Sequence, residues 1–84
     1  MKSRPKVTIY TSTGCSDCKL TRSVLDEVGV QYTEINLDLV PEAVEVVLAA
    51  NGGYRIVPTL VFADGRVLVE PGRQELLIAL APST

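Results

Sequence analysis

The pattern of apolar and polar positions predicts two strands and an intervening helix in the first half of the chain. Residues 6–11 are rich in β-branched and aromatic side chains, which favours a strand. A helix is expected over 16–28 and Gly29 suits its end, while 30–36, with Tyr32 and Ile35, predicts a second strand. The apolar positions of that helix recur on one face: Leu20, Val24, Leu25 and Val28.

The second half of the chain predicts a helix, then a β-hairpin, then a last helix. Pro41 suits the first turn of a helix that runs to about residue 50 and ends at Asn51-Gly52-Gly53. Residues 58–62 predict a third strand, Asp64-Gly65 a two-residue hairpin turn, and 66–69 a fourth strand. A last helix is expected over 73–81, ended by Pro82. The inward-facing residues of the two helices are Val44, Val47, Leu48, Leu76, Leu77 and Leu80.

The expected order of elements is therefore β-α-β-α-β-β-α. A helix joins the first two strands, which implies parallel pairing with a right-handed crossover. The hairpin adds one antiparallel strand, so we expect an α/β fold with a four-stranded mixed sheet flanked by helices. With 84 residues and no repeat or linker, we expect a single domain over 1–84.

Composition and charge narrow the function classes. The chain is 46% hydrophobic and 21% charged, as is usual for a globular protein. A net charge of −2 argues against a nucleic-acid binder. The apolar run after the basic start is too short for a secretory signal, and no run approaches a membrane span. We therefore expect a cytoplasmic protein. The absence of histidine removes Cys–His catalysis, the serine triad and mixed Cys/His zinc sites.

The motif that carries chemistry is Cys15-Ser16-Asp17-Cys18, between the first strand and the first helix. Cys15 would lie at the helix N-terminus, where free N–H groups and the helix dipole favour a thiolate, the form that attacks disulfides. Cys18, nearly one turn further on, can close a disulfide with Cys15. Because it lies deeper in the helix, it should be less exposed, as suits a resolving thiol.

Other interpretations of these residues stay open. A structural disulfide is disfavoured by a reducing compartment and by the very short loop it would close. Half of a metal site would need a second chain to complete it. Asp17 should oppose a second negative charge beside it, although an acid also suits a helix start. Val57-Pro58 can simply open a strand, and an X–Pro bond is cis in only about 5–6% of cases.

Together these motifs resemble the glutaredoxins. The shared features are the Cys-x-x-Cys after a first strand, Val57-Pro58 some forty residues later and the β-β-α ending. More narrowly, Asn51-Gly52-Gly53, Val57-Pro58-Thr59 and residues 61–65 resemble the mycoredoxins. The resemblance implies a thioredoxin-like fold, thiol–disulfide oxidoreductase activity and a cis bond at Val57-Pro58.

The resemblance also implies substrate contacts. The backbone of Val57 would pair with the substrate's cysteinyl unit, and Pro58 would set the geometry. Arg55 could hold a substrate carboxylate, or be a solvated surface arginine. We further assign substrate contact to two pairs that flank the site: Thr13 and Gly14 in the turn before Cys15, and Glu70 and Pro71 after the fourth strand.

The expected activity is disulfide reduction. Cys15 attacks a protein disulfide or a mixed disulfide, and Cys18 or a second small thiol resolves the intermediate. We expect no tightly bound cofactor, no nucleic-acid or membrane partner, and a monomer. A low-molecular-weight thiol (mycothiol, bacillithiol or glutathione) or an NADPH-dependent flavoprotein reductase would recycle the protein.

Departures from the family patterns leave the recycling thiol open. Ser12 stands where glutathione-using members often have lysine, Glu70-Pro71-Gly72-Arg73 replaces a Gly-Gly-acidic run, and Gly14 replaces the mycoredoxin aromatic. Three alternative functions remain. One is a redoxin that donates electrons to ribonucleotide reductase through thioredoxin reductase. Another is an iron–sulfur carrier that shares a cluster between two chains through Cys15. The third is a non-redox binding domain that keeps the fold, in which Cys15 would have an ordinary thiol pKa of about 8.5.

Overall fold

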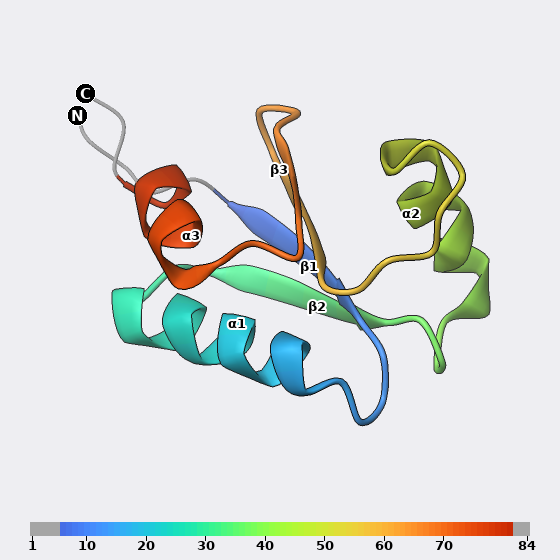
Figure 1. Ribbon diagram of the computed structural model, residues 1–84, viewed down its shortest axis with the longest axis horizontal. Helices are drawn as coiled ribbons and strands as arrows, with labels where there is room; N and C mark the ends of the chain where they lie inside the picture. The colour runs from blue at the N-terminus through green and yellow to red at the C-terminus, as the bar shows by residue number, and fades with distance from the viewer. Residues whose placement is uncertain (1–5, 82–84) are drawn as a thin grey trace.

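The computed structural model describes residues 6–81. A four-stranded sheet in the order β2-β1-β3-β4 forms its centre (Figure 1). The elements, in chain order, are β1 (Val7–Thr11), α1 (Ser16–Val28), β2 (Tyr32–Asn36), the 3₁₀ turn η1 (Pro41–Ala43), α2 (Val44–Ala50), β3 (Thr59–Phe62), β4 (Val67–Val69) and α3 (Arg73–Ala79). The predicted element order and the thioredoxin-like fold class are confirmed.

Strand pairing places three chain segments at one end of the sheet. β1 and β2 are parallel, so Thr11 and Asn36, their last residues, pair side by side. β3 runs antiparallel to β1, and its first residue, Thr59, pairs with Tyr10. The turn that carries the cysteines, the loop after β2 and the segment before β3 therefore all meet at this end.

Two hydrophobic clusters cover the two faces of the sheet. One joins Val24 and Leu25 of α1 and Leu76 and Leu80 of α3 to the sheet. The other joins Tyr10 of β1 to Val47 of α2. Because side chains alternate along a strand, neighbouring β1 residues serve opposite clusters. The layers are thus α1 and α3 on one face and α2 on the other (Figure 1).

The first helix begins and ends where the sequence predicts. Cys15 is its N-cap, in an extended conformation with φ −81° and ψ 108°. Gly29 ends it in the left-handed region at φ 81°, where its N–H bonds the Leu25 and Asp26 carbonyls. Glycine has no Cβ to clash there, which explains the stop. The boundaries of this helix are fixed by its own caps.

Other boundaries differ from the predicted ones. The second helix opens with a 3₁₀ turn, β2 begins at Tyr32, β4 begins at Val67 and α3 ends at Ala79. The hairpin loop has three residues, 63–65, and not two, because the Phe62 N–H bonds the Arg66 carbonyl and the Gly65 N–H bonds the Phe62 carbonyl. Gly65, at φ 96°, supplies the left-handed residue that such a loop requires. Pro82 lies outside the described residues.

Leu20 is the clearest error in the predicted core. It is 66% exposed, whereas Val24 and Leu25 are buried. The buried side of α1 also contains Cys18 and Thr21, so the covered stripe is centred away from Leu20. Of the other predicted inward residues, Val47, Leu76 and Leu80 are buried, and Val28, Val44, Leu48 and Leu77 are half-buried.

Candidate active site

The cysteine pair lies at the start of α1. Cys15 and Cys18 are joined by a disulfide, with their Cα atoms 5.2 Å apart. The Cys18 backbone N–H donates a hydrogen bond of 3.1 Å to the Cys15 Sγ. Cys15 is half-buried and Cys18 is fully buried. The sulfur at the helix cap is therefore the accessible one of the two.

The turn before Cys15 is held from the neighbouring strand end. The Thr13 N–H donates to the Asp38 carboxylate at 2.9 Å, and the Asn36 side chain donates to the Thr13 hydroxyl at 3.3 Å. Arg55 donates to the other Asp38 oxygen at 3.3 Å. The guanidinium of Arg55 is thus engaged with Asp38, on the exposed side of this network. Asp38 and Asn36 fix the position of the turn that delivers Cys15.

Gly14 gives that turn its shape. Its φ is +77°, in the left-handed region, and no atom lies near the place of a Cβ. A side chain would have room but would strain the backbone. The aromatic residue of mycoredoxins at this position would therefore need a different local conformation.

The Val57-Pro58 bond is cis, as the resemblance implied and against the base rate for X–Pro bonds. Pro58 is buried, and its carbonyl accepts the Glu70 N–H at 2.9 Å. Among the described residues, nothing bonds the backbone N–H or carbonyl of Val57. Both groups therefore lack a hydrogen-bond partner within the described part of the chain.

A groove of about 410 Å³ lies between α1, Pro58 and the segment that leads into α3. Glu70 and Pro71 line it, together with Asp17 and Leu20 of α1. Glu70 is the only described non-glycine residue with positive φ, at 46°. Sequence reasoning assigned Glu70 and Pro71 to the site but missed Leu20, because its spacing resembled that of a core residue.

An ion pair joins α1 and α3 next to this groove, and its Arg73 also lines the groove. Arg73 of α3 meets Glu27 of α1 through contacts of 2.6 and 3.5 Å. The hydrogen bond and the charge of Arg73 lower the pKa of Glu27, and Glu27 in turn raises the pKa of Arg73. The charge of Arg73 is therefore balanced within the protein.

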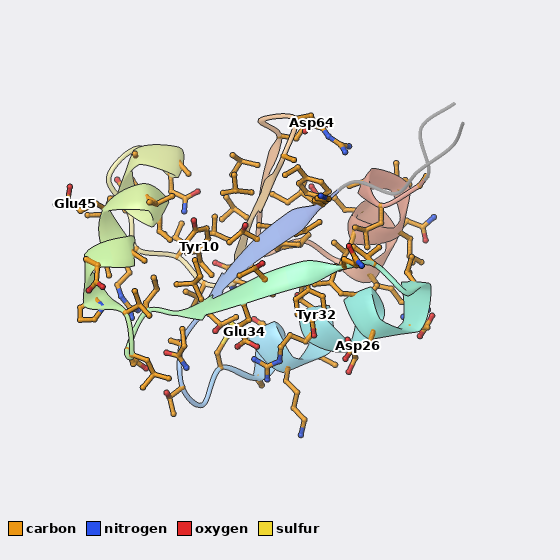
Figure 2. All side chains as sticks on the ribbon, turned by 180° about the vertical axis from the view of Figure 1, so that it is seen from behind. Tyr10, Asp26, Tyr32, Glu34, Glu45 and Asp64 are labelled. Atoms are coloured by element: carbon orange, nitrogen blue, oxygen red, sulfur yellow. A yellow bond between two sulfur atoms is a disulfide. The ribbon has the colours of Figure 1, made fainter. Side chains whose placement is uncertain are left out.

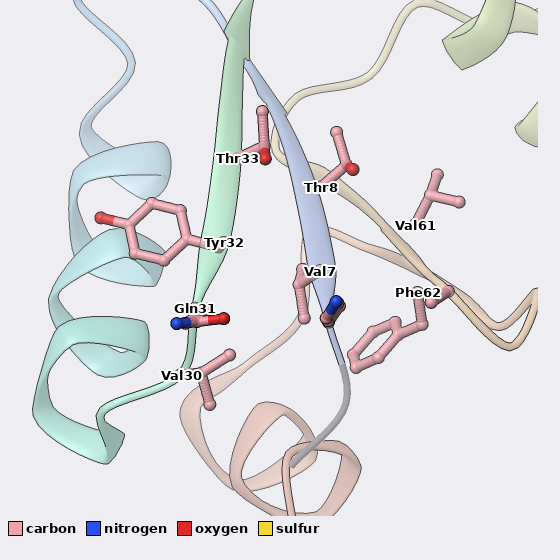
Figure 3. Close-up of a pocket in the computed structure, with 10 residues that line it drawn as sticks. Val7, Thr8, Val30, Gln31, Tyr32, Thr33, Val61 and Phe62 are labelled. Carbon is pink, nitrogen blue, oxygen red and sulfur yellow. The ribbon is translucent and has the colours of Figure 1, made fainter. Parts of the chain in front are cut away.

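A larger hollow, of about 850 Å³, lies at the other end of the strands (Figure 3). Val7, Tyr32 and Phe62 line it, far along β1 and β3 from the cysteine turn. Tyr32 points toward Asp26 of α1 and donates to it at 3.0 Å (Figure 2). Burial raises the pKa of the Tyr32 phenol, and this hydrogen bond acts in the same direction. No cysteine lines this hollow.

Sequence reasoning missed Asp38, although a signal for it existed. Asn36 and Asp38 sit at the end of a strand parallel to β1, and parallel strands end at the same edge of a sheet. Within residues 6–81, no group of three or more Cys, Asp or Glu side chains is placed to hold a metal ion. No helix of the described part is long and apolar enough to cross a membrane.

Comparison with known proteins places this site in a family. The family model described as "Glutaredoxin" matches residues 7–68 of this chain. A glutaredoxin of Mycobacterium tuberculosis is 37% identical over 70 residues, which cover 83% of each chain. Mycoredoxin 1 of Corynebacterium glutamicum is 38% identical over 71 residues, 84% of this chain and 87% of its own. The structure of NrdH-redoxin from Escherichia coli superposes with a TM-score of 0.78 at 29% identity, covering 94% of this chain and 99% of the other.

The fold and the cysteine pair define a thiol–disulfide redoxin of the thioredoxin-like class. Within this class, the sequence matches identify the family: the chain belongs to the glutaredoxin family.

Proposed function

We propose that this protein reduces disulfides, with Cys15 as the attacking group. The observation that carries the proposal is the asymmetry of the pair: Cys15 caps α1 and is accessible, while Cys18 is bonded to it from a fully buried position. An N-cap sulfur that accepts a backbone N–H is stabilised as a thiolate by that bond and by the helix dipole.

The reaction balances in two steps. The Cys15 thiolate attacks one sulfur of the substrate disulfide, and the other substrate sulfur leaves as a thiolate that takes up a proton. The Cys18 thiolate then attacks the Cys15 sulfur and releases the second substrate thiol. The substrate gains two electrons and the pair ends as the Cys15–Cys18 disulfide. Two molecules of a small thiol, or a flavoprotein reductase that draws on NADPH, would return it to the dithiol.

The substrate's cysteinyl unit would lie against Val57 and Pro58. The unpaired Val57 backbone groups could bind an extended segment as an added strand does. Thr13 and Gly14 would flank the reacting sulfurs on one side, and Glu70 and Pro71 on the other. Arg55 is less suited to hold a substrate carboxylate than the sequence suggested, since Asp38 already engages it.

Variants of the two cysteines test this proposal. Reduced protein is assayed against mixed disulfides of glutathione, mycothiol and bacillithiol. We expect Cys15→Ser to fall to the rate of buffer. We expect Cys18→Ser to retain turnover of mixed disulfides, because a second small thiol can resolve the intermediate. Activity of Cys15→Ser equal to that of the unmodified protein would contradict the proposal.

A second candidate is electron donation to ribonucleotide reductase. It is supported by the likeness to NrdH-redoxin from Escherichia coli, a glutaredoxin-like protein with a thioredoxin-like activity profile. In that case the protein would turn over only with thioredoxin reductase and NADPH, and Cys18 would be indispensable. The same two variants, assayed with that reductase, separate the two candidates.

A further inference from the structure

The groove beside the cysteines has an apolar lining. Leu20, Val24, Pro58, Pro71 and Leu76 contribute to it from α1, the cis-proline turn and the region of α3. A single exposed leucine is ordinary on a protein surface. Leu20, at 66% exposure, differs because it belongs to a continuous apolar hollow that begins at the cysteine helix. Such a hollow is suited to take one or two apolar side chains of a partner.

The groove is lined by acidic side chains that no described basic side chain balances. Asp17 and Glu70 both line it, and neither carboxylate has an ion pair or hydrogen bond to any described side chain. Arg73 also lines it, but Glu27 balances its charge. Lys19 lies on the same helix and does not line the groove. Two uncompensated negative charges therefore flank an apolar surface.

We propose that Asp17 and Glu70 make this groove select substrate-protein segments that have an apolar residue and a lysine or arginine next to the reacting cysteine. The inference rests on the proposed disulfide reductase function and names its substrate class. A cationic side chain beside the cysteine would meet Asp17 or Glu70, while its apolar neighbour fills the space by Leu20 and Pro71. An acidic segment, or a small thiol that presents carboxylates to these two side chains, would be repelled.

A pair of matched peptides tests the selection. Each peptide contains one cysteine as a mixed disulfide with 2-mercaptoethanol and a leucine two positions before it. One peptide has lysine on both sides of the cysteine and the other has glutamate. The measured quantity is kcat/KM for each peptide, and dithiothreitol gives the intrinsic ratio without a protein.

With the unmodified protein, kcat/KM for the lysine peptide is divided by kcat/KM for the glutamate peptide. We expect this ratio to exceed the intrinsic ratio, measured with dithiothreitol, by roughly five- to tenfold at low ionic strength, as two surface charge pairs allow. The excess should vanish in the Asp17→Asn/Glu70→Gln double variant. It should also vanish near 1 M salt, where the Debye length is about 3 Å. Any change in Cys15 reactivity affects both peptides alike and cancels in the ratio.

Glu45→Gln is the matched control. Glu45 is an exposed acid on α2, on the opposite face of the sheet from the groove (Figure 2). The Glu45→Gln variant should keep the full excess of the lysine-to-glutamate ratio over the intrinsic ratio. Leu20→Ala should raise KM for both peptides and leave their ratio unchanged.

Distinct results would overturn the two proposals. If the double variant keeps the excess, or the unmodified protein shows none, the groove does not select by charge while disulfide reduction stands. If neither peptide nor bis(2-hydroxyethyl) disulfide is reduced faster by the unmodified protein than by Cys15→Ser, the reductase function itself fails, and the groove proposal fails with it.

Discussion

At the residue scale, two cysteines three positions apart have very different surroundings. Cys15 precedes the helix and meets solvent, whereas Cys18 is within its first turn and fully buried. Only the first can reach a bulky disulfide. In the proposed reaction, the helix start therefore divides attack and resolution between two chemically identical side chains.

Asp17 lies between them and is exposed. Its negative charge opposes ionisation of a nearby thiol. We expect Asp17→Asn to lower the pKa of the Cys15 thiol in the reduced protein, measured by thiolate absorbance against pH, while Glu45→Gln leaves it unchanged. A titration with no change or a rise in Asp17→Asn would reject this role.

Glu70 adopts a left-handed conformation that favours glycine, at φ 46°. A Cβ there crowds the backbone, so Glu70→Gly should be more stable than Glu70→Ala by about 1 kcal/mol. Urea unfolding of the two oxidised variants measures the difference. Equal stability would show that the backbone relaxes at this position.

At the element scale, α1 serves two surfaces at once. Its Leu25 belongs to the core against β1 and α3, and its Leu20 opens onto the groove. The cysteine helix thus anchors the fold with one face and lines the apolar groove with another.

These two leucines should respond differently to truncation. Leu25 is fully buried, so Leu25→Ala should lower the free energy of unfolding by about 2–5 kcal/mol. Leu20→Ala should change it by less than about 0.5 kcal/mol, because Leu20 is already in contact with water. Denaturant unfolding compares them, and a similar loss for both would contradict the assigned burial.

At the scale of the whole molecule, one ion pair ties α1 to α3 across residues distant in the sequence. Arg73 holds the pKa of Glu27 below its usual 4.5. A lowered folded pKa stabilises the fold above the unfolded pKa, and this stabilisation is lost as pH falls through the folded pKa. Asp64 in the hairpin also has a lowered pKa, below its usual 3.8. The larger cause is the hydrogen bond from the Arg66 backbone N–H, and the Arg66 side chain acts in the same direction.

We therefore expect Glu27→Gln to be less stable than the unmodified protein at pH 6, and this difference to disappear as pH falls below 4. Urea unfolding at a series of pH values measures it, with Glu45→Gln as the control. A difference that persists at the acid end would mean that Glu27 acts through packing and not through its charge.

The sequence by itself determined what depends on near neighbours. Helical spacing, the stop at Gly29 and the strand-turn-helix setting of Cys15 and Cys18 all follow from interactions within a few residues, and the predicted element order follows from them. The cis bond at Pro58 was implied only by the resemblance, since the local preference of an X–Pro bond is trans.

The tertiary structure decided what depends on which surfaces meet. Leu20 has the spacing of a core residue, but the sheet and α3 cover the side of α1 that carries Thr21 and Leu25. Asp38 reaches the turn before Cys15 only because β1 and β2 end together, and Arg55 comes from a third segment to contact Asp38. The groove has walls from segments some fifty residues apart, and no local pattern reports contacts at that separation, because they form only when the helices pack on the sheet.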